Sequence, residues 1–152
     1  MAKIHRISAP DGVVKLVNFD LALIQSSLHR RPDDDDRLRQ RFDRRYVVPE
    51  VWRSPCAATP VSDIYSLGIV FYQLITGETP YGDIEAVSDA GGVTPLNFDL
   101  LMGELGTPGS EDLMKSPEDA AAVIRRMVDQ KPGRRYQSMD EVCEDLTILK
   151  DE

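Results

Sequence analysis

The chain has 152 residues, a formal net charge of −8, and a composition that is 41% hydrophobic and 29% charged. This composition is that of a globular domain with its own core, which excludes global disorder. The negative charge disfavours a general nucleic-acid binder, and no run approaches about eighteen apolar residues, so we expect no membrane span.

The cysteine pattern gives an expectation about the compartment. Cys56 and Cys143 lack the spacing of a zinc site, and the only histidines are His5 and His29. Thiols in this pattern are typical of reduced residues in an intracellular protein. Because no apolar stretch follows a basic start at the N-terminus, no secretory signal is expected. We therefore predict a cytoplasmic protein.

The N-terminal part predicts a β-hairpin followed by a long loop. Residues 3–8 and 13–17 read as two strands, the second rich in β-branched side chains, and residues 9–12 (APDG) read as the turn between them. Residues 25–45 show little periodicity and much charge, which predicts an exposed loop of a length that is usually functional or disordered.

Residues 62–77 predict a central helix. Ser62 suits the N-cap, and Gly77 suits a left-handed residue just past the C-terminus. Apolar residues occupy nearly every face, so we expect this helix to be buried all round. The side chains expected to be nearly inaccessible are those of Ile64, Leu67, Phe71 and Leu74.

Three further helices are predicted after the central one. Residues 98–105 predict a short helix. A second begins at Pro117, with Ser116 as its cap, and a third begins with Ser138 and Glu141 as a capping box. The residues alone thus predict a mainly α fold of the α+β type, with a hairpin, a long loop and four or five helices.

Four segments, in this order, resemble motifs of the protein kinase family. Residues 14–22 (VKLVNFDLA) resemble the strand and metal-binding loop, whose usual core is Asp-Phe-Gly. Residues 46–50 (YVVPE) resemble the end of the activation segment, usually Ala-Pro-Glu. Residues 62–81 resemble the central helix and its exit, and residues 131–138 (KPGRRYQS) resemble the loop before the last helix. The resemblance covers about residues 12–148.

The resemblance implies a domain organisation. The chain is similar to the C-terminal lobe of a serine/threonine-type kinase, in a divergent or pseudokinase-like form, so that residues 1–152 form a partial kinase-like domain. It begins with a β-hairpin over residues 1–20, continues with an activation-segment-like loop over residues 18–50, and ends with a helical lobe over residues 51–150 that surrounds a buried central helix.

The resemblance also implies three structural residues. In the family, a glutamate at the end of the activation segment pairs with an arginine before the last helix, and these positions are Glu50 and Arg135 here. A guanidinium can hold a carboxylate through two parallel hydrogen bonds, so we expect a buried or half-buried ion pair. The family's aspartate early in the central helix, which holds the backbone of the catalytic loop, is Asp63. An acid favoured by the helix dipole is the other interpretation of Asp63.

The metal-binding loop departs from the family pattern. Asn18 replaces the magnesium-binding aspartate, and its amide brings no charge to a hard cation, so it is a weak metal candidate. Asp20 replaces the glycine and either lends a carboxylate to the cofactor site or caps the loop. Asp43 stands where a threonine is expected. A complete parent would use ATP and Mg²⁺, but we expect neither to bind tightly to this chain.

No catalytic residue is identified. A kinase needs a glycine-rich loop, a paired lysine and a catalytic-loop aspartate, and in the family these precede the position of Asn18, before which stand only residues 1–17. His5 does not open a catalytic His-Arg-Asp sequence, because Ile7 occupies the aspartate position. We therefore expect the chain alone to be inactive.

Two hypotheses remain, together with a set of partners. One is a fragment of a serine/threonine kinase, and the other is a pseudokinase that serves as a binding or scaffold module. Ser26 and Ser27 are possible phosphorylation sites beside nearby arginines, although an unmodified loop is the other interpretation. The expected partners are a protein substrate or partner protein and the remaining kinase segments, supplied by another chain or by the same gene. Neither nucleic acid nor a membrane is expected.

Overall fold

The structure is a computed structural model that describes residues 45–54, 57–78, 97–106 and 117–151. The chain divides into two compact units, Met1–Phe42 and Asp43–Glu152. Every described residue belongs to the second unit. The predicted hairpin, and the predicted loop before residue 45, lie outside the described residues.

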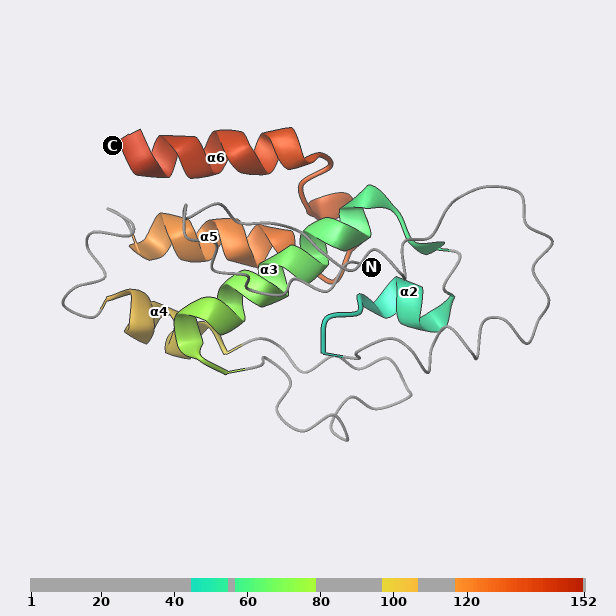
Figure 1. Ribbon diagram of the computed structural model, residues 1–152, viewed down its shortest axis with the longest axis horizontal. Helices are drawn as coiled ribbons and strands as arrows, with labels where there is room; N and C mark the ends of the chain where they lie inside the picture. The colour runs from blue at the N-terminus through green and yellow to red at the C-terminus, as the bar shows by residue number, and fades with distance from the viewer. Residues whose placement is uncertain (1–44, 55–56, 79–96, 107–116, 152) are drawn as a thin grey trace, which may run out of the picture. The chain divides into compact units, whose positions relative to one another are not determined.

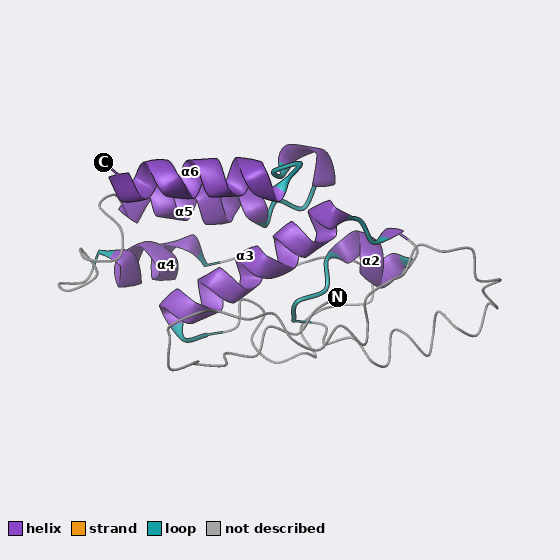
Figure 2. Ribbon diagram, turned by 45° about the horizontal axis from the view of Figure 1, so that its top comes forward, coloured by secondary structure: helices purple, strands orange, loops and turns teal. Residues whose placement is uncertain are grey.

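The described part is helical (Figures 1 and 2). Its elements are α2 (Pro49–Arg53), α3 (Pro60–Thr76), α4 (Phe98–Leu105), α5 (Pro117–Met127), the 3₁₀ turn η4 (Pro132–Arg134) and α6 (Met139–Asp151). None of the helices in this part of the chain is long and apolar enough to cross a membrane. The prediction of a mainly helical lobe is confirmed for these residues.

The N-cap of the central helix α3 lies three residues before the predicted one, Ser62. Its N-cap is Thr59, with Pro60 at the first helical position, where proline's fixed φ favours helix initiation. Ser62 is instead the third helical residue, and its Oγ accepts a hydrogen bond from the Thr59 backbone N–H at 3.2 Å. The C-terminus is as predicted, because Gly77 has a left-handed φ of 72° and its N–H donates to the Gln73 carbonyl.

Only one side of α3 is buried, which corrects the prediction of a helix buried all round. Ile64 is nearly inaccessible, as predicted, and so is Tyr72 farther along the same side. In contrast, Leu67 and Phe71 are only half-buried, and Leu74 is 62% exposed. The apolar pattern shows that every face tolerates burial, but α4 and α5 pack against one side of the helix alone.

Helix α5 is the middle layer of the helical packing. It contacts α3 on one side and α6 on the other, and α4 contacts both α3 and α5. The approach to α3 is close at Gly68, where an added Cβ would lie 2.8 Å from the Met127 Cβ and 2.7 Å from the Val128 Cγ1. Glycine is therefore the residue that allows this packing.

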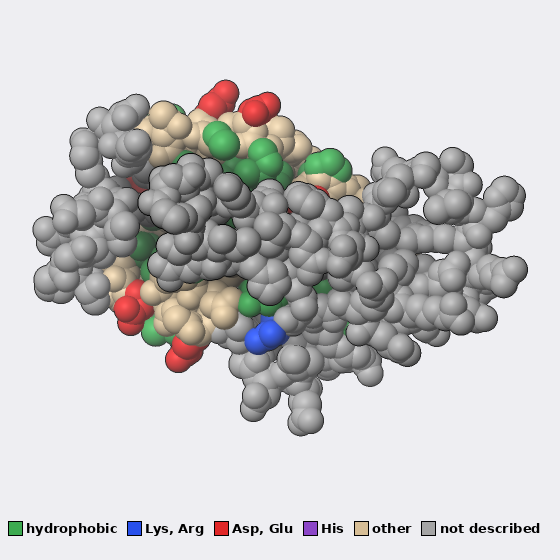
Figure 3. Space-filling view, viewed as in Figure 1, with side chains coloured by type: hydrophobic (Ala, Val, Ile, Leu, Met, Phe, Trp, Pro, Cys, Tyr) green, Lys and Arg blue, Asp and Glu red, His purple; other side chains and the backbone are tan. Residues whose placement is uncertain are grey.

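The last helix begins where the sequence predicts. The Ser138 Oγ accepts a hydrogen bond from the Glu141 backbone N–H at 3.3 Å, which is half of the predicted capping box. Hydrophobic and acidic side chains both reach the surface on the face drawn in Figure 3. On α6, Met139 and Ile148 are 43% and 54% exposed. Helix α5 begins at Pro117 as predicted, while its expected cap Ser116 lies outside the described residues.

Candidate functional site

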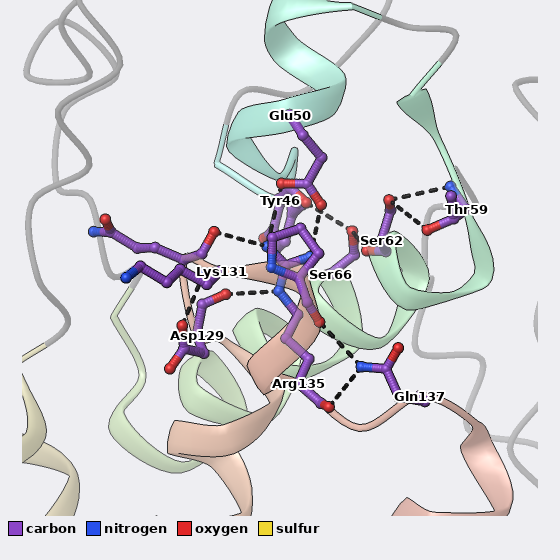
Figure 4. A network of polar contacts seen from close by, with 11 residues as sticks. Tyr46, Glu50, Thr59, Ser62, Ser66, Asp129, Lys131, Arg135 and Gln137 are labelled. Atoms are coloured by element: carbon purple, nitrogen blue, oxygen red, sulfur yellow. Dashed lines mark hydrogen bonds and ion pairs between the residues drawn. The ribbon is translucent and has the colours of Figure 1, made fainter.

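Arg135 is the centre of the candidate site (Figure 4). Its side chain is fully buried, and its guanidinium holds both carboxylate oxygens of Glu50, with Nη1 to Oε1 at 2.7 Å and Nη2 to Oε2 at 3.2 Å. Nε donates to the Asp129 carbonyl at 2.6 Å, and Nη2 also donates to the Gln130 carbonyl at 3.4 Å. The guanidinium carbon lies 4.9 Å from the centre of the Tyr65 ring on α3. The buried charge is therefore neutralised, hydrogen bonded and stacked.

The loop that presents Arg135 is shaped by its own short-range hydrogen bonds. The Arg135 N–H closes the 3₁₀ turn by donating to the Pro132 carbonyl at 3.2 Å, and the Lys131 N–H donates to Asp129 Oδ1 at 2.8 Å. The side-chain amide of Gln137 donates to the carbonyls of Pro132, at 3.1 Å, and Arg135, at 2.9 Å (Figure 4). The loop backbone therefore has partners within a few residues of itself.

Glu50 is presented by the short helix α2. Pro49 stands at its first position and Glu50 in its first turn, where an acidic side chain suits the helix dipole. Val48 and Val51, on either side, are buried at 1% and 4% exposure, so the backbone of this segment is fixed in the core. The predicted ion pair between Glu50 and Arg135 is confirmed, and it joins residues 85 positions apart in the sequence.

A second anchor, which the sequence reasoning missed, fixes the other end of residues 46–50. The Tyr46 hydroxyl donates to Gln73 Oε1 at 2.5 Å. The Ser66 hydroxyl is 2.8 Å from the Tyr46 carbonyl and 3.1 Å from the Ser62 carbonyl of its own helix. Ser66 and Gln73 are seven residues apart on α3 and so share a face. Two polar residues at that spacing in an apolar helix are the sequence pattern that could have predicted this anchor.

Asp63 lies in the first turn of α3 with its side chain exposed. Neighbouring protein atoms displace part of the water around its carboxyl, and this desolvation raises its pKa above the ordinary value. Within the described residues Asp63 forms no hydrogen bond or ion pair. Its place on α3 agrees with the position that the sequence assigned to it, while its role in holding a catalytic loop stays a prediction.

The other predicted site residues lie outside the described part of the chain. These are Asn18 and Asp20 of the metal-binding loop and the possible phosphorylation sites Ser26 and Ser27. Among the residues that the structure describes, no group of His, Cys, Asp or Glu could hold a metal ion. The described contacts hold the Glu50 segment against the loop that carries Arg135.

Comparison with known proteins agrees with this geometry. The protein kinase domain matches residues 7–146. The chain is 33% identical over 90 residues to a probable serine/threonine-protein kinase of Clostridium acetobutylicum, covering 59% of this chain and 12% of that protein. It is 31% identical over 107 residues to serine/threonine-protein kinase PrkC of Bacillus subtilis, covering 70% of this chain and 15% of that protein.

A plant relative matches over a longer stretch. Protein STRUBBELIG-RECEPTOR FAMILY 5 of Arabidopsis thaliana is 32% identical over 158 aligned residues, which cover 96% of this chain and 22% of that protein. The chain thus spans less than a quarter of the length of these three relatives. With the domain match extending from residue 7 to residue 146, the chain belongs to the protein kinase family.

Proposed function

We propose that this chain is the C-terminal-lobe part of a serine/threonine protein kinase-like protein. A complete parent would transfer phosphate from ATP, with Mg²⁺, to hydroxyl groups of a protein substrate. The observation that carries the proposal is the bidentate contact between Glu50 and Arg135, because it joins the end of the activation-segment-like loop to the helical lobe in the way the family resemblance implies.

In this proposal the described residues position the segment and do no chemistry. Tyr46 and Glu50 attach the two ends of residues 46–50 to α3 and to the loop before α6. A segment attached at both ends presents a fixed backbone to a substrate, which lowers the entropy lost when the substrate binds. Asn18 and Asp20 replace the aspartate and the glycine of the family's metal-binding loop, so the sequence lacks the usual aspartate ligand for magnesium at position 18.

We also propose that the chain alone is inactive. The resemblance assigns no residue of this chain to the glycine-rich loop, the paired lysine or the catalytic aspartate, and positioning groups without those three leave phosphoryl transfer without its main charge stabilisation. A pseudokinase parent is the second candidate. The observation that favours it is the sequence at three positions, because Asn18, Asp20 and Asp43 replace the family's aspartate, glycine and threonine.

The outer side of α3 is the proposed contact for the remaining kinase segments. At 100° per residue, Asp63, Leu67 and Leu74 lie within about 40° of one another around the helix. This stripe combines a carboxyl of raised pKa with apolar side chains that are half-buried or exposed. An exposed carboxyl and partly exposed apolar side chains in one stripe favour a partner that supplies hydrogen-bond donors and apolar contacts. We propose that this partner is the rest of the kinase domain, working in the cytoplasm.

Phosphate transfer by two proteins tests the proposal. One is the 152-residue chain, and the other is the same chain joined to the sequence encoded upstream of Met1. We expect the joined protein to phosphorylate a protein substrate from labelled ATP and the chain alone to be silent. Transfer by the chain alone that Asn18→Ala abolishes would contradict its inactivity. A joined protein that folds and shows no transfer would favour the pseudokinase.

Light scattering tests the proposed contact on α3. We expect the chain alone to self-associate at micromolar concentration, and Leu74→Glu to reduce this because it places a charge in the apolar stripe. Ile148→Glu is the matched control, since Ile148 is also a large exposed apolar residue but lies on α6. Equal effects of the two substitutions would show that the stripe on α3 is not a special contact surface.

A further inference from the structure

A second polar cluster lies next to the Arg135 site and joins α5 to α6. Its centre is Tyr136, which is 1% exposed and whose hydroxyl donates to Asp145 Oδ2 at 2.6 Å. The guanidinium carbon of Arg126 lies 3.9 Å from the centre of the Tyr136 ring. The same guanidinium is 3.2 Å from Glu141 Oε2 and 3.6 Å from Asp145 Oδ2. The ring is therefore covered by a cation, and its hydroxyl is held by an anion.

The protonation state of Tyr136 fits this arrangement. Burial, together with the hydrogen bond to Asp145 and the charge of that carboxylate, raises the pKa of the Tyr136 hydroxyl to about 12. The phenol therefore stays neutral and remains a donor at ordinary pH.

The backbone connects this cluster to the ion pair. Arg135 has φ −74° and ψ 172°, an extended conformation that turns its side chain and that of Tyr136 in different directions. Tyr136 accordingly contacts α5 and α6, while Arg135 contacts Glu50 and Asp129. The next residue is also held from α6, because the Gln137 N–H donates to Glu141 Oε2 at 3.3 Å.

We infer that Tyr136 is a positioning residue for Arg135, and that its contacts with Asp145 and Arg126 set the direction in which the Arg135 guanidinium meets Glu50. The inference rests on the proposed function, in which the Glu50 pair fixes the end of the activation-segment-like loop. It adds that the setting of this loop depends on α6, which holds the residues that follow Arg135 through the Tyr136 hydroxyl and the Gln137 N–H.

Hydrogen exchange in α2 tests the inference. The Ser54 N–H donates to the Glu50 carbonyl at 3.0 Å, so its protection reports on the α2 segment. We compare the wild-type chain with Tyr136→Phe, Glu50→Gln and the double variant. We expect Tyr136→Phe to accelerate exchange at Ser54 about tenfold relative to amides of α5, as local opening of α2 requires. In the Glu50→Gln background the same substitution should add little, because the contact it supports is already lost.

Tyr72→Phe is the matched control. It also removes the hydroxyl of a buried tyrosine, one that donates to the Asn97 carbonyl at 3.2 Å on the other side of the core. We expect it to lower global stability without a selective effect on Ser54. Acceleration by Tyr136→Phe that does not exceed that of Tyr72→Phe, or additive effects in the double variant, would overturn the inference.

The two proposals fail in different ways. If Glu50→Gln leaves α2 protected, the anchoring role of Glu50 in the proposed function is wrong. If Glu50→Gln exposes α2 and Tyr136→Phe does not, only the present inference is wrong.

Should Tyr136→Phe not fold, Asp145→Asn replaces it, because an amide oxygen still accepts from the tyrosine but carries no charge. An NMR resonance of Arg135 Nε–H that shifts in Asp145→Asn, and not in the α6 control Thr147→Val, supports the inference; an unshifted resonance overturns it.

Discussion

Two arginines of this lobe make similar contacts in different surroundings. Arg135 and Arg126 each pair with a glutamate and each lie over a tyrosine ring. The Arg135 side chain is fully buried and its partner Glu50 is 23% exposed, whereas Arg126 and its partner Glu141 are 47% and 41% exposed. Water competes for the pair of Arg126 and Glu141 and hardly for the pair of Arg135 and Glu50. Breaking the two pairs should therefore change the free energy of unfolding by different amounts.

The surroundings also decide what happens when one partner is lost. Arg135 has backbone carbonyls of Asp129 and Gln130 as further acceptors, and these neutral groups cannot replace the charge of Glu50. Arg126 can turn to solvent if a carboxylate is removed, because nearly half of its side chain is already exposed. Because Arg135 is buried, loss of Glu50 leaves a charge that water cannot reach, so the folded state depends on this contact.

The largest expected effect follows from stranding the buried guanidinium. Glu50→Gln should lower the free energy of unfolding by about 3 kcal/mol, the low end for a buried pair, since Glu50 itself is partly exposed. Urea denaturation measures this. Glu141→Gln is the matched control and should cost less than about 1 kcal/mol. Equal losses for the two variants would show that burial does not separate the pairs.

A substitution at the contact between α3 and α5 should disturb the contacts of Arg135 and leave those of Arg126 in place. Gly68→Ala places a Cβ 2.8 Å from the Met127 Cβ, which forces the helices apart and should cost about 2 kcal/mol. It separates Tyr65 on α3 from Asp129 after α5, the two sides that hold Arg135. The contacts of Arg126 involve α5, the loop after it and α6, so they should persist.

Gly103→Ala is the control for this substitution. Gly103 lies in α4 with nothing within 4 Å of an added Cβ, so alanine there should raise stability by about 0.5 kcal/mol through helix propensity. Thermal unfolding of the two variants gives the comparison. A neutral Gly68→Ala would mean that the packing of α3 on α5 tolerates expansion.

The Tyr136 hydroxyl, which donates to Asp145, predicts a loss of stability at alkaline pH. Its pKa is raised to about 12 in the folded chain, so above pH 10, the ordinary tyrosine pKa, the unfolded chain loses the proton first. The stabilisation is therefore complete below about pH 10 and is lost as the pH rises through about 12, by roughly 1–2 kcal/mol after solvent screening. Urea denaturation across this range should show a shallower decline for Tyr136→Phe than for the wild-type chain; parallel curves would contradict the raised pKa.

The smallest expected effect belongs to the exposed arginine. Arg126→Met removes two solvent-exposed ion pairs and a cation–π contact but keeps an apolar chain over the Tyr136 ring, so it should cost about 0.5–1 kcal/mol. Most of this loss should disappear in about 1 M salt, where exposed charges are screened. The loss caused by Glu50→Gln should change little with salt, and a similar salt dependence for both would contradict the comparison.

The sequence predicts the helices and one of their long-range contacts. The apolar periodicity and caps locate α3, α5 and α6, with an error of three residues at the start of α3, because Pro60 begins the helix before Ser62. The pair of Glu50 and Arg135 was predicted through the family resemblance, since two charges 85 positions apart show no local pattern.

Two other features could not be predicted from the sequence. The exposure of Leu74 depends on which elements cover α3, and an apolar pattern shows what a face tolerates, not what packs on it. The contact of Tyr136 with Asp145 joins a loop to a helix at a separation of nine residues, which matches no helical or strand period. Both depend on tertiary packing, which outweighs local preference.

The short helix α2 has an optical consequence. The chain contains a single tryptophan, and it is Trp52, two residues after Glu50 on this helix. Indole emission from the folded chain therefore originates in the helix that carries Glu50 and nowhere else. A change in that emission at constant helix content is a local signal of α2 leaving Arg135, so the lobe carries its own reporter for the attachment of this segment.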